Sequence, residues 1–317
     1  MTEIALPGRA EVTAHRHPRV GYAMLAVSAS LFAVNGAVSK VILTSTGMSS
    51  LRLTELRATG AFLCLAAFLL VVAPDRLRVR RDEMALLAFY GVAGFALVQW
   101  LYFVAIERLP IGIGLLLEFT APVLVALWAR LVWHEPVRRR VWAALALALA
   151  GLAFVAEVWE DVRLDTVGVV AGLVAAGSLA TYFLAGEHQT ARRDALSLTC
   201  LSLGVAALFW AVVQPWWGFP FEALGETISL DGALEDVTAP VWLLCAWMIV
   251  LGTIAPFVLS LGALRHLPAT RVSIVAMSEV VLASIVAWVW LGETLSAAQL
   301  FGGTVVLLGI VLAQTSR

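Results

Sequence analysis

The sequence predicts an all-α integral membrane protein, in which ten transmembrane helices form two inverted five-helix repeats. Three observations carry this prediction. Of the 317 residues, 61% are apolar and only 14% are charged, and the mean hydropathy is +0.92. A soluble domain carries about 25% charged residues. The apolar residues gather in ten long runs, and segments 158 positions apart in the chain are similar.

Each apolar run is long enough to cross a bilayer as a helix, which takes about 20 mostly apolar residues. The runs lie at 20–43, 51–73, 84–106, 109–133, 141–158, 167–187, 195–216, 240–262, 268–291 and 297–315. The second opens with charged residues and the fifth is the shortest. The runs are rich in Leu and Ala and lack the strict alternation of barrel strands. The polar segment 1–19 does not resemble a signal peptide, so we expect it to be a cytoplasmic tail.

The arginines predict how the helices are oriented. Fourteen lie in the two tails and in the connections after the second, fourth, sixth and eighth runs, whereas the opposite connections hold only Arg108 and Arg163. Because basic residues are retained in the cytoplasm, this imbalance places both termini there. The long connection 217–239 holds five acidic residues and no basic one, as an exported connection should.

A shift of 158 positions relates the two halves. It places Leu109-Pro110 on Leu267-Pro268 and Glu135 on Glu293, with nine identities over residues 105–151. The predicted repeats are 20–158 and 167–315. Because each has an odd number of spans, the second enters the membrane from the opposite side. Inverted repeats of this kind are typical of secondary transporters, whose substrate site lies near the midplane, although such a repeat can also be purely structural.

Several motifs resemble one known family. Leu-Gly-Glu-Thr-Leu at 291–295, after the fourth helix of the second repeat, is similar to the drug/metabolite transporter (DMT) superfamily in its EamA-type branch. Tyr90-Gly91, the segments 109–113 and 117–122, and Arg57 early in the second run are similar to the bacterial threonine/homoserine exporters. This resemblance covers about residues 20–315.

The resemblance implies a secondary active transporter in the bacterial plasma (inner) membrane. It would export a small metabolite such as threonine or homoserine by proton antiport, through a cavity lined mainly by helices other than the fifth and tenth. Drugs or other metabolites of the superfamily are alternative solutes. Two positions depart from the family pattern. His134 precedes Glu135 where Gly is usual, and Val280 follows Glu279 where Pro is common. The second leaves open whether the ninth helix is kinked as the fourth is expected to be at Pro122.

Two glutamates are the first candidates for the transport chemistry. Glu118 and Glu279 lie near the middle of the fourth and ninth runs, the equivalent helices of the two repeats. An ionisable group in hydrocarbon costs at least about 2.5 kcal/mol, so each is a functional candidate. One could bind a substrate ammonium group and one could accept a proton. Alternatively, each is neutral and only forms hydrogen bonds to a neighbouring helix.

Further polar candidates lie in other runs. Arg57 could hold a substrate carboxylate through two parallel hydrogen bonds, or it could extend to the interface or pair with Glu55. The remaining candidates are polar or amphipathic residues that could contact substrate or form interhelical hydrogen bonds: Asn35, Gln99, Trp100, Thr120, Tyr182 and Ser278.

Other classes of protein lack support in the sequence. The net charge is −1 and the basic residues are scattered, which excludes a nucleic-acid partner. There is no metal-binding or nucleotide-binding motif, so we expect no cofactor, no metal and no enzymatic activity. An integral membrane enzyme or a non-transporting scaffold remains the alternative from another class. The expected partners are a small solute, protons and the lipid bilayer, with the chain acting as a monomer or homodimer.

Overall fold

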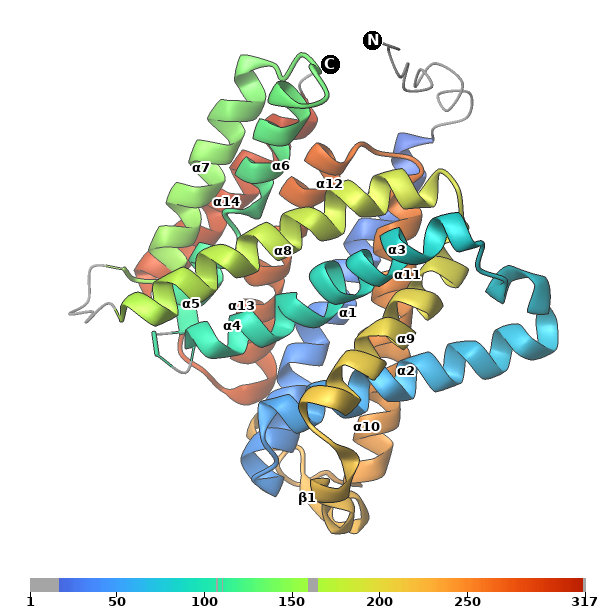
Figure 1. Cartoon of the computed structure of the whole chain (residues 1–317). Coiled ribbons are helices and arrows are strands. Elements are labelled where there is room, and N and C mark those ends of the chain that lie inside the picture. Colours follow the sequence, from blue (N-terminus) through green and yellow to red (C-terminus); the bar gives the residue numbers. More distant parts are fainter. Residues whose placement is uncertain (1–16, 107, 110, 159–164, 316–317) are drawn as a thin grey trace.

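The computed structural model describes residues 17–106, 108–109, 111–158 and 165–315, so residues 1–16 of the expected tail, Pro110 and Arg163 lie outside the described residues. The described chain is a bundle of long helices (Figure 1). They are α1 Pro18–Thr46, α2 Ser50–Val72, α3 Arg81–Tyr90, α4 Leu97–Ile106, α5 Ile111–Glu118, α6 Ala121–Leu131, α7 Arg139–Val155, α8 Thr166–Thr190, α9 Ala195–Val213, α10 Val241–Ile249, α11 Ala255–Leu264, α12 Ala269–Ala276, α13 Ser278–Leu291 and α14 Ala297–Gln314.

These helices confirm the predicted all-α membrane fold. Nine continuous or interrupted helices in the described part are long and apolar enough to cross a membrane. The fifth predicted span is α7, which has 17 residues, one fewer than the span formed by α14. Four of the spans consist of two shorter helices each: α3 with α4, α5 with α6, α10 with α11, and α12 with α13.

The third span of each repeat is interrupted at the same place. A π-helical turn joins α3 to α4 at Gly91–Ala96, and another joins α10 to α11 at Val250–Ile254. Adding 158 to the first turn gives 249–254, so the interruption repeats with the sequence. A π-helical turn has one residue more than an α-helical turn and is frequent at functional sites. The two turns therefore mark equivalent positions in the two repeats.

The fourth span of each repeat is also broken at one repeat position. Between α5 and α6 the break includes Phe119, and Pro122 follows as the second residue of α6. The equivalent residue of Phe119 is Met277, where α12 ends and α13 begins. The ninth span is therefore broken although Val280 stands where relatives often have proline. The amide of Met277 donates to the carbonyl of Ile274 at 3.2 Å, which closes a tighter turn than an α-helix does.

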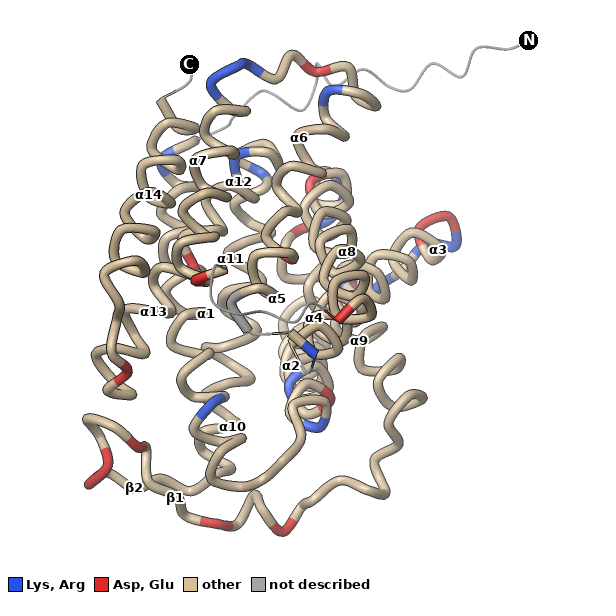
Figure 2. Tube along the Cα trace, turned by 90° about the vertical axis from the view of Figure 1, so that its left-hand side faces the viewer, with Lys and Arg blue, Asp and Glu red and all other residues tan. Residues whose placement is uncertain are grey.

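One end of the bundle gathers the arginine-rich connections. The guanidinium of Arg193, after α8, donates to the Glu83 carboxylate at 2.6 Å and to the carbonyls of Arg76 and Arg78 in the connection after α2. The connections after the second and sixth spans therefore lie at the same end, as ten alternating spans require. Figure 2 shows basic residues also in the connection before α7 and in α12.

The opposite end carries the long acidic connection between α9 and α10. It contains a two-stranded antiparallel sheet of β1 (Thr227–Ser229) and β2 (Thr238–Pro240). At this end Arg52 donates to the carbonyls of Gln214 and Pro215 at 3.3 and 3.0 Å. The start of α2 thus meets the end of α9, again as the alternation predicts.

Helices α7 and α14, the last helix of each repeat, pack side by side at one edge of the bundle (Figures 1 and 2). Glycines allow the close approach. A Cβ added at Gly302 would lie 2.5 Å from the carbonyl oxygen of Gly151, and one at Gly309 would lie 2.9 Å from that of Ala144. A Cβ added at Gly303 would instead lie 3.5 Å from the side chain of Val281 in α13. Small residues at a membrane helix interface let backbones pack closely.

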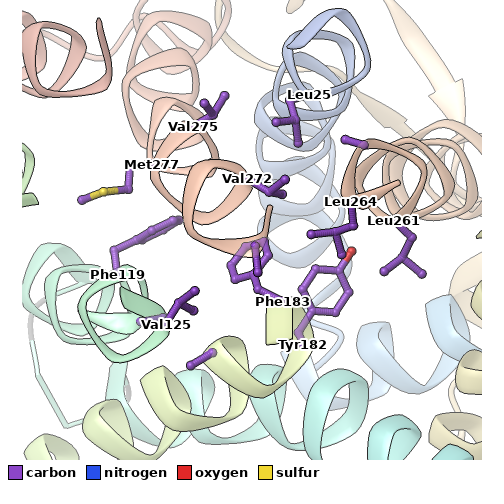
Figure 3. Packing of buried hydrophobic residues seen from close by; sticks show 14 of the residues in the cluster. Leu25, Phe119, Val125, Tyr182, Phe183, Leu261, Leu264, Val272, Val275 and Met277 are labelled. Carbon is purple, nitrogen blue, oxygen red and sulfur yellow. The ribbon is translucent and has the colours of Figure 1, made fainter. Parts of the chain in front are cut away.

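One buried core serves both repeats. In Figure 3, Phe119 and Val125 of the first repeat belong to the same packed cluster as Phe183 and Val272 of the second. The two repeats are therefore packed through a shared interior, and a site at its centre is lined by both.

Candidate functional site

A small central space lies where the second and third spans of the two repeats meet. Its lining residues are Thr54, Arg57, Ala58, Phe95, Gln99, Leu203, Ala206, Trp210, Thr253 and Phe257. It encloses about 270 Å³ of empty volume, part of which is open to solvent. None of these lining residues belongs to α7 or α14.

The lining residues include two pairs related by the repeat. Phe95 is equivalent to Thr253, and Gln99 to Phe257, since each pair is 158 positions apart. The space therefore lies between equivalent helices of the two repeats. This is where inverted-repeat transporters have their substrate sites.

Arg57 reaches this space from α2. Its Nε donates to the hydroxyl of Thr253 at 2.8 Å, and its guanidinium carbon lies 5.9 Å from the centroid of the Phe257 ring. The Glu55 carboxylate, one partner that the sequence offered for Arg57, pairs instead with Arg52 at 2.8 Å. Arg57 therefore points into the bundle and does not extend to its end.

The two candidate glutamates lie beyond the lining and belong to one electrostatic group with Arg57. Glu118 is the last residue of α5 and only 9% exposed, while Glu279 is the second residue of α13. Glu279 interacts electrostatically with Arg57 and with Glu118. Both carboxylates also interact with Tyr102 of α4.

Asn35 packs against the second π-helical turn. Its side chain is 5% exposed and contacts Gly252, where an added Cβ would overlap the Asn35 Oδ1 atom. Within the described part of the chain this oxygen has no hydrogen-bond partner. Asn35 and Arg57 thus contact consecutive residues of one π-helical turn from two different helices.

Tyr182 supports the wall of the space and does not line it. It is 4% exposed, and its ring centroid lies 5.4 Å from that of Phe95 and 5.8 Å from that of Phe257. Its ring is also stacked on Tyr90, whose hydroxyl donates to the Tyr182 carbonyl at 3.1 Å. This aromatic cluster fixes the two lining phenylalanines.

The remaining candidates occupy other places. Gln99 lines the space. Trp100 packs on the core with its ring centroid 6.3 Å from that of Phe209. The Thr120 hydroxyl donates to the Leu117 carbonyl at 2.6 Å, at the break of the fourth span, and Ser278 is the first residue of α13 at the equivalent break.

Thr253, Phe257 and Trp210 are not among the site residues that the sequence predicts. A signal for the first two was present, because Gly252-Thr253 and Pro256 interrupt an otherwise apolar run. Glycine and proline within a helix mark a kink or a bulge. Trp210 gives no such signal, since tryptophan is also common near the ends of transmembrane helices.

The fold and the central space define a membrane transporter built from two related halves. The sequence pattern of the EamA-like transporter family matches residues 19–156 and 166–315, one match for each repeat. The chain belongs to this family. It is therefore a multi-pass membrane transporter of the drug/metabolite class, and not an enzyme.

Individual proteins similar to this chain are also named as transporters. The chain is 30% identical over 268 residues to the threonine/homoserine exporter RhtA of Escherichia coli (strain K12), covering 84% of this chain and 79% of the relative. It is 29% identical over 297 residues to an uncharacterized transporter of Archaeoglobus fulgidus, covering 93% and 96%. One solved crystal structure matches with a TM-score of 0.69 over 96% of this chain and 97% of its own, at 17% identity, which shows the fold alone.

Proposed function

We propose that the protein exports a small amino acid such as threonine or homoserine by proton antiport across the bacterial inner membrane. The observation that carries this proposal is the group of ionisable side chains Arg57, Glu279 and Glu118 inside the bundle, which interact electrostatically. Ionisable residues within a membrane protein mark substrate and proton pathways by default. The similarity to RhtA supports the choice of solute.

An amino acid zwitterion complements this group. The planar guanidinium of Arg57 matches a carboxylate through two parallel hydrogen bonds. A glutamate carboxylate is suited to an ammonium group.

Proton coupling follows if ammonium and proton compete for one carboxylate. A buried carboxylate is costly unless it is paired or protonated. Glu279 interacts with the positive Arg57, whereas Glu118 interacts with Glu279 and Tyr102, neither of which is positive. Within the described part of the chain, Glu118 thus lacks a positive partner, which a proton or an ammonium group would supply.

The arginine distribution sets the proposed orientation. Both termini and the connection containing Arg139 would face the cytoplasm, and the acidic connection between α9 and α10 would face outside. Export would then carry the solute from the arginine-rich end to the acidic end.

Transport into inside-out membrane vesicles tests the proposal. With an acidic interior, vesicles that contain the protein should accumulate labelled threonine or homoserine, and a protonophore should abolish this accumulation. Arg57→Ala should reduce uptake at least tenfold, because a lost charge-assisted hydrogen-bond pair costs about 1.5–3 kcal/mol or more. Arg130→Ala, which removes an exposed arginine of α6, is the matched control and should leave uptake unchanged.

Two results would contradict the proposal. No gradient-dependent uptake of either amino acid would exclude them as substrates. Uptake of an aromatic metabolite or drug in their place would move the assignment to another solute of the same superfamily. The aromatic lining residues Phe95, Trp210 and Phe257 make that second arm of the experiment worthwhile.

A further inference from the structure

We infer that Thr253 is the positioning residue that makes Arg57 a carboxylate-specific binding group, so that the transporter discriminates amino acids from the corresponding amines. This inference rests on the proposed function and extends it to the basis of specificity. Thr253 is 1% exposed and lies within the second π-helical turn.

The hydroxyl of Thr253 is held in one orientation. It donates to the carbonyl of Met248 at 2.9 Å, five residues earlier, across the π-helical turn. Its proton is therefore engaged, and its oxygen accepts from Nε of Arg57 at 2.8 Å. Since the backbone of the turn fixes this hydroxyl, it acts toward Arg57 only as an acceptor.

This contact determines which atoms of Arg57 remain for a ligand. A guanidinium donates through Nε and through its two terminal nitrogens. With Nε bound to Thr253, the two terminal nitrogens are the donors left to form a fork, the geometry that matches a carboxylate. Phe257 restricts the same group from a second side, with the guanidinium carbon 5.9 Å from its ring centroid.

The repeat relation shows that this arrangement belongs to one half only. The equivalent of Thr253 in the first π-helical turn is Phe95, which lines the same space but has no hydroxyl to hold a cation. The carboxylate of a solute would therefore be held on the Thr253 side. The two faces of a nearly symmetric space thereby become chemically different.

The test compares three variants in the vesicle assay with labelled threonine. Thr253→Val keeps the shape of the side chain but removes the hydroxyl, and it should raise KM about tenfold while the maximal rate stays within about twofold, the pattern of lost binding without lost turnover. Thr253→Ser retains the hydroxyl and should restore the wild-type KM. Thr199→Val removes a buried hydroxyl that, in the described part of the chain, donates to the carbonyl of Ala195 of its own helix at 2.7 Å, and should change neither value.

Competition by 1-amino-2-propanol, which is threonine without its carboxylate, measures discrimination directly. If Thr253 had only a structural role, its replacement would leave this discrimination unchanged. In the wild type this amine should compete at least tenfold less well than unlabelled threonine. In Thr253→Val the two competitors should approach equality, because the carboxylate has lost its oriented partner.

The outcomes separate the inference from the proposed function. Wild-type KM and wild-type discrimination in Thr253→Val would overturn the positioning role and leave the proposed function intact. A wild-type protein that does not transport threonine would overturn both. A wild-type protein that transports threonine but binds the amine equally well would overturn the inference alone. Equal effects of Val and Ser at position 253 would also overturn the inference, since they would reflect packing and not the hydroxyl.

Discussion

Phe95 and Thr253 occupy equivalent positions of the two repeats and line one central space from the two π-helical turns. The backbone therefore repeats while the side chains differ. The turn of the second repeat contacts Arg57 and Asn35, and that of the first belongs to an aromatic cluster with Tyr90 and Tyr182. A symmetric scaffold thus presents an asymmetric site, as a zwitterionic solute with two different ends requires.

Cysteine labelling tests the orientation of the bundle. Asp231 and Arg139 are exposed in connections at opposite ends, so cysteines at these positions report on opposite sides. In a variant lacking Cys64, Cys200 and Cys245, an impermeant thiol reagent added outside intact cells should label Asp231→Cys and not Arg139→Cys. The opposite pattern would invert the proposed orientation. Labelling of both positions would contradict their placement at opposite ends of the bundle.

The sequence predicts the features that depend on neighbouring residues, and it does not predict those that depend on contacts between distant segments of the chain. The spans and the repeat follow from local composition and from the shift of 158, and the structure agrees. The π-helical turns are not predicted, because a glycine or proline within an apolar run indicates a kink or a bulge but not its type. Helix geometry explains why Glu55 forms an ion pair with Arg52 and not with Arg57. Arg52 lies three residues before it and faces it on the helix, whereas Arg57, two residues after it, does not.

The position of Arg57 at the site could not be predicted from helix geometry, because it depends on a hydrogen bond to Thr253, 196 residues later in the chain. The break in the middle of the ninth span could not be predicted from the sequence either. α12 ends at Ala276, and no proline lies in the four residues that follow it. Contacts between distant segments of the chain therefore place the site, while local sequence places the helices that carry it.

The packing of α7 on α14 predicts unequal effects at two adjacent glycines. Gly302→Ala would bring a methyl group within 2.5–2.7 Å of backbone atoms of α7, so it should lower the free energy of unfolding by about 1–3 kcal/mol. Gly303→Ala is the matched control, since its methyl group would lie 3.5 Å from Val281, an ordinary contact. Thermal unfolding in detergent, followed by size-exclusion chromatography, measures both. Equal stability of the two variants would contradict the close contact.

Gly292 permits a test of backbone conformation without any packing change. It ends α13 with a φ of +69°, and the equivalent residue His134 has a φ of +55°, so both repeats end their fourth span in the left-handed region. An added Cβ at Gly292 would meet no atom within 4 Å. Gly292→Ala should therefore destabilise the protein by about 1–2 kcal/mol through its backbone conformation alone.

The control for Gly292 is a glycine inside a helix. Gly177 of α8 also has open space around its Cβ position but has ordinary helical geometry. Gly177→Ala should raise the unfolding temperature, because alanine in a helix is favoured over glycine by roughly 0.5–1 kcal/mol. Similar changes in both variants would show that the left-handed conformation at Gly292 is not required.

The mechanistic prediction concerns Glu118. This residue ends α5 at the break of the fourth span, one turn before Pro122, and its side chain is buried. Pro122 has no amide hydrogen to donate to the carbonyl of Glu118. A backbone carbonyl and a carboxyl group therefore share one turn, which creates a polar position suited to an ammonium group or a proton.

If the Glu118 carboxyl group must release its proton in every export cycle, Glu118→Gln should fold normally, because glutamine has the same shape and no charge to bury. Gradient-driven accumulation of threonine in inside-out vesicles should fall to the level seen without a gradient. Exchange of solute down its own gradient should survive with a higher KM, because the ammonium group also loses this carboxylate. Glu279→Gln is the comparison: it removes the carboxylate that interacts with Arg57 but leaves Glu118 in place, so gradient-driven accumulation should remain. If Glu118 only forms hydrogen bonds to its neighbours, glutamine will function almost normally. Near-wild-type proton-coupled uptake by Glu118→Gln would therefore exclude Glu118 as the proton carrier and leave Glu279 as the candidate.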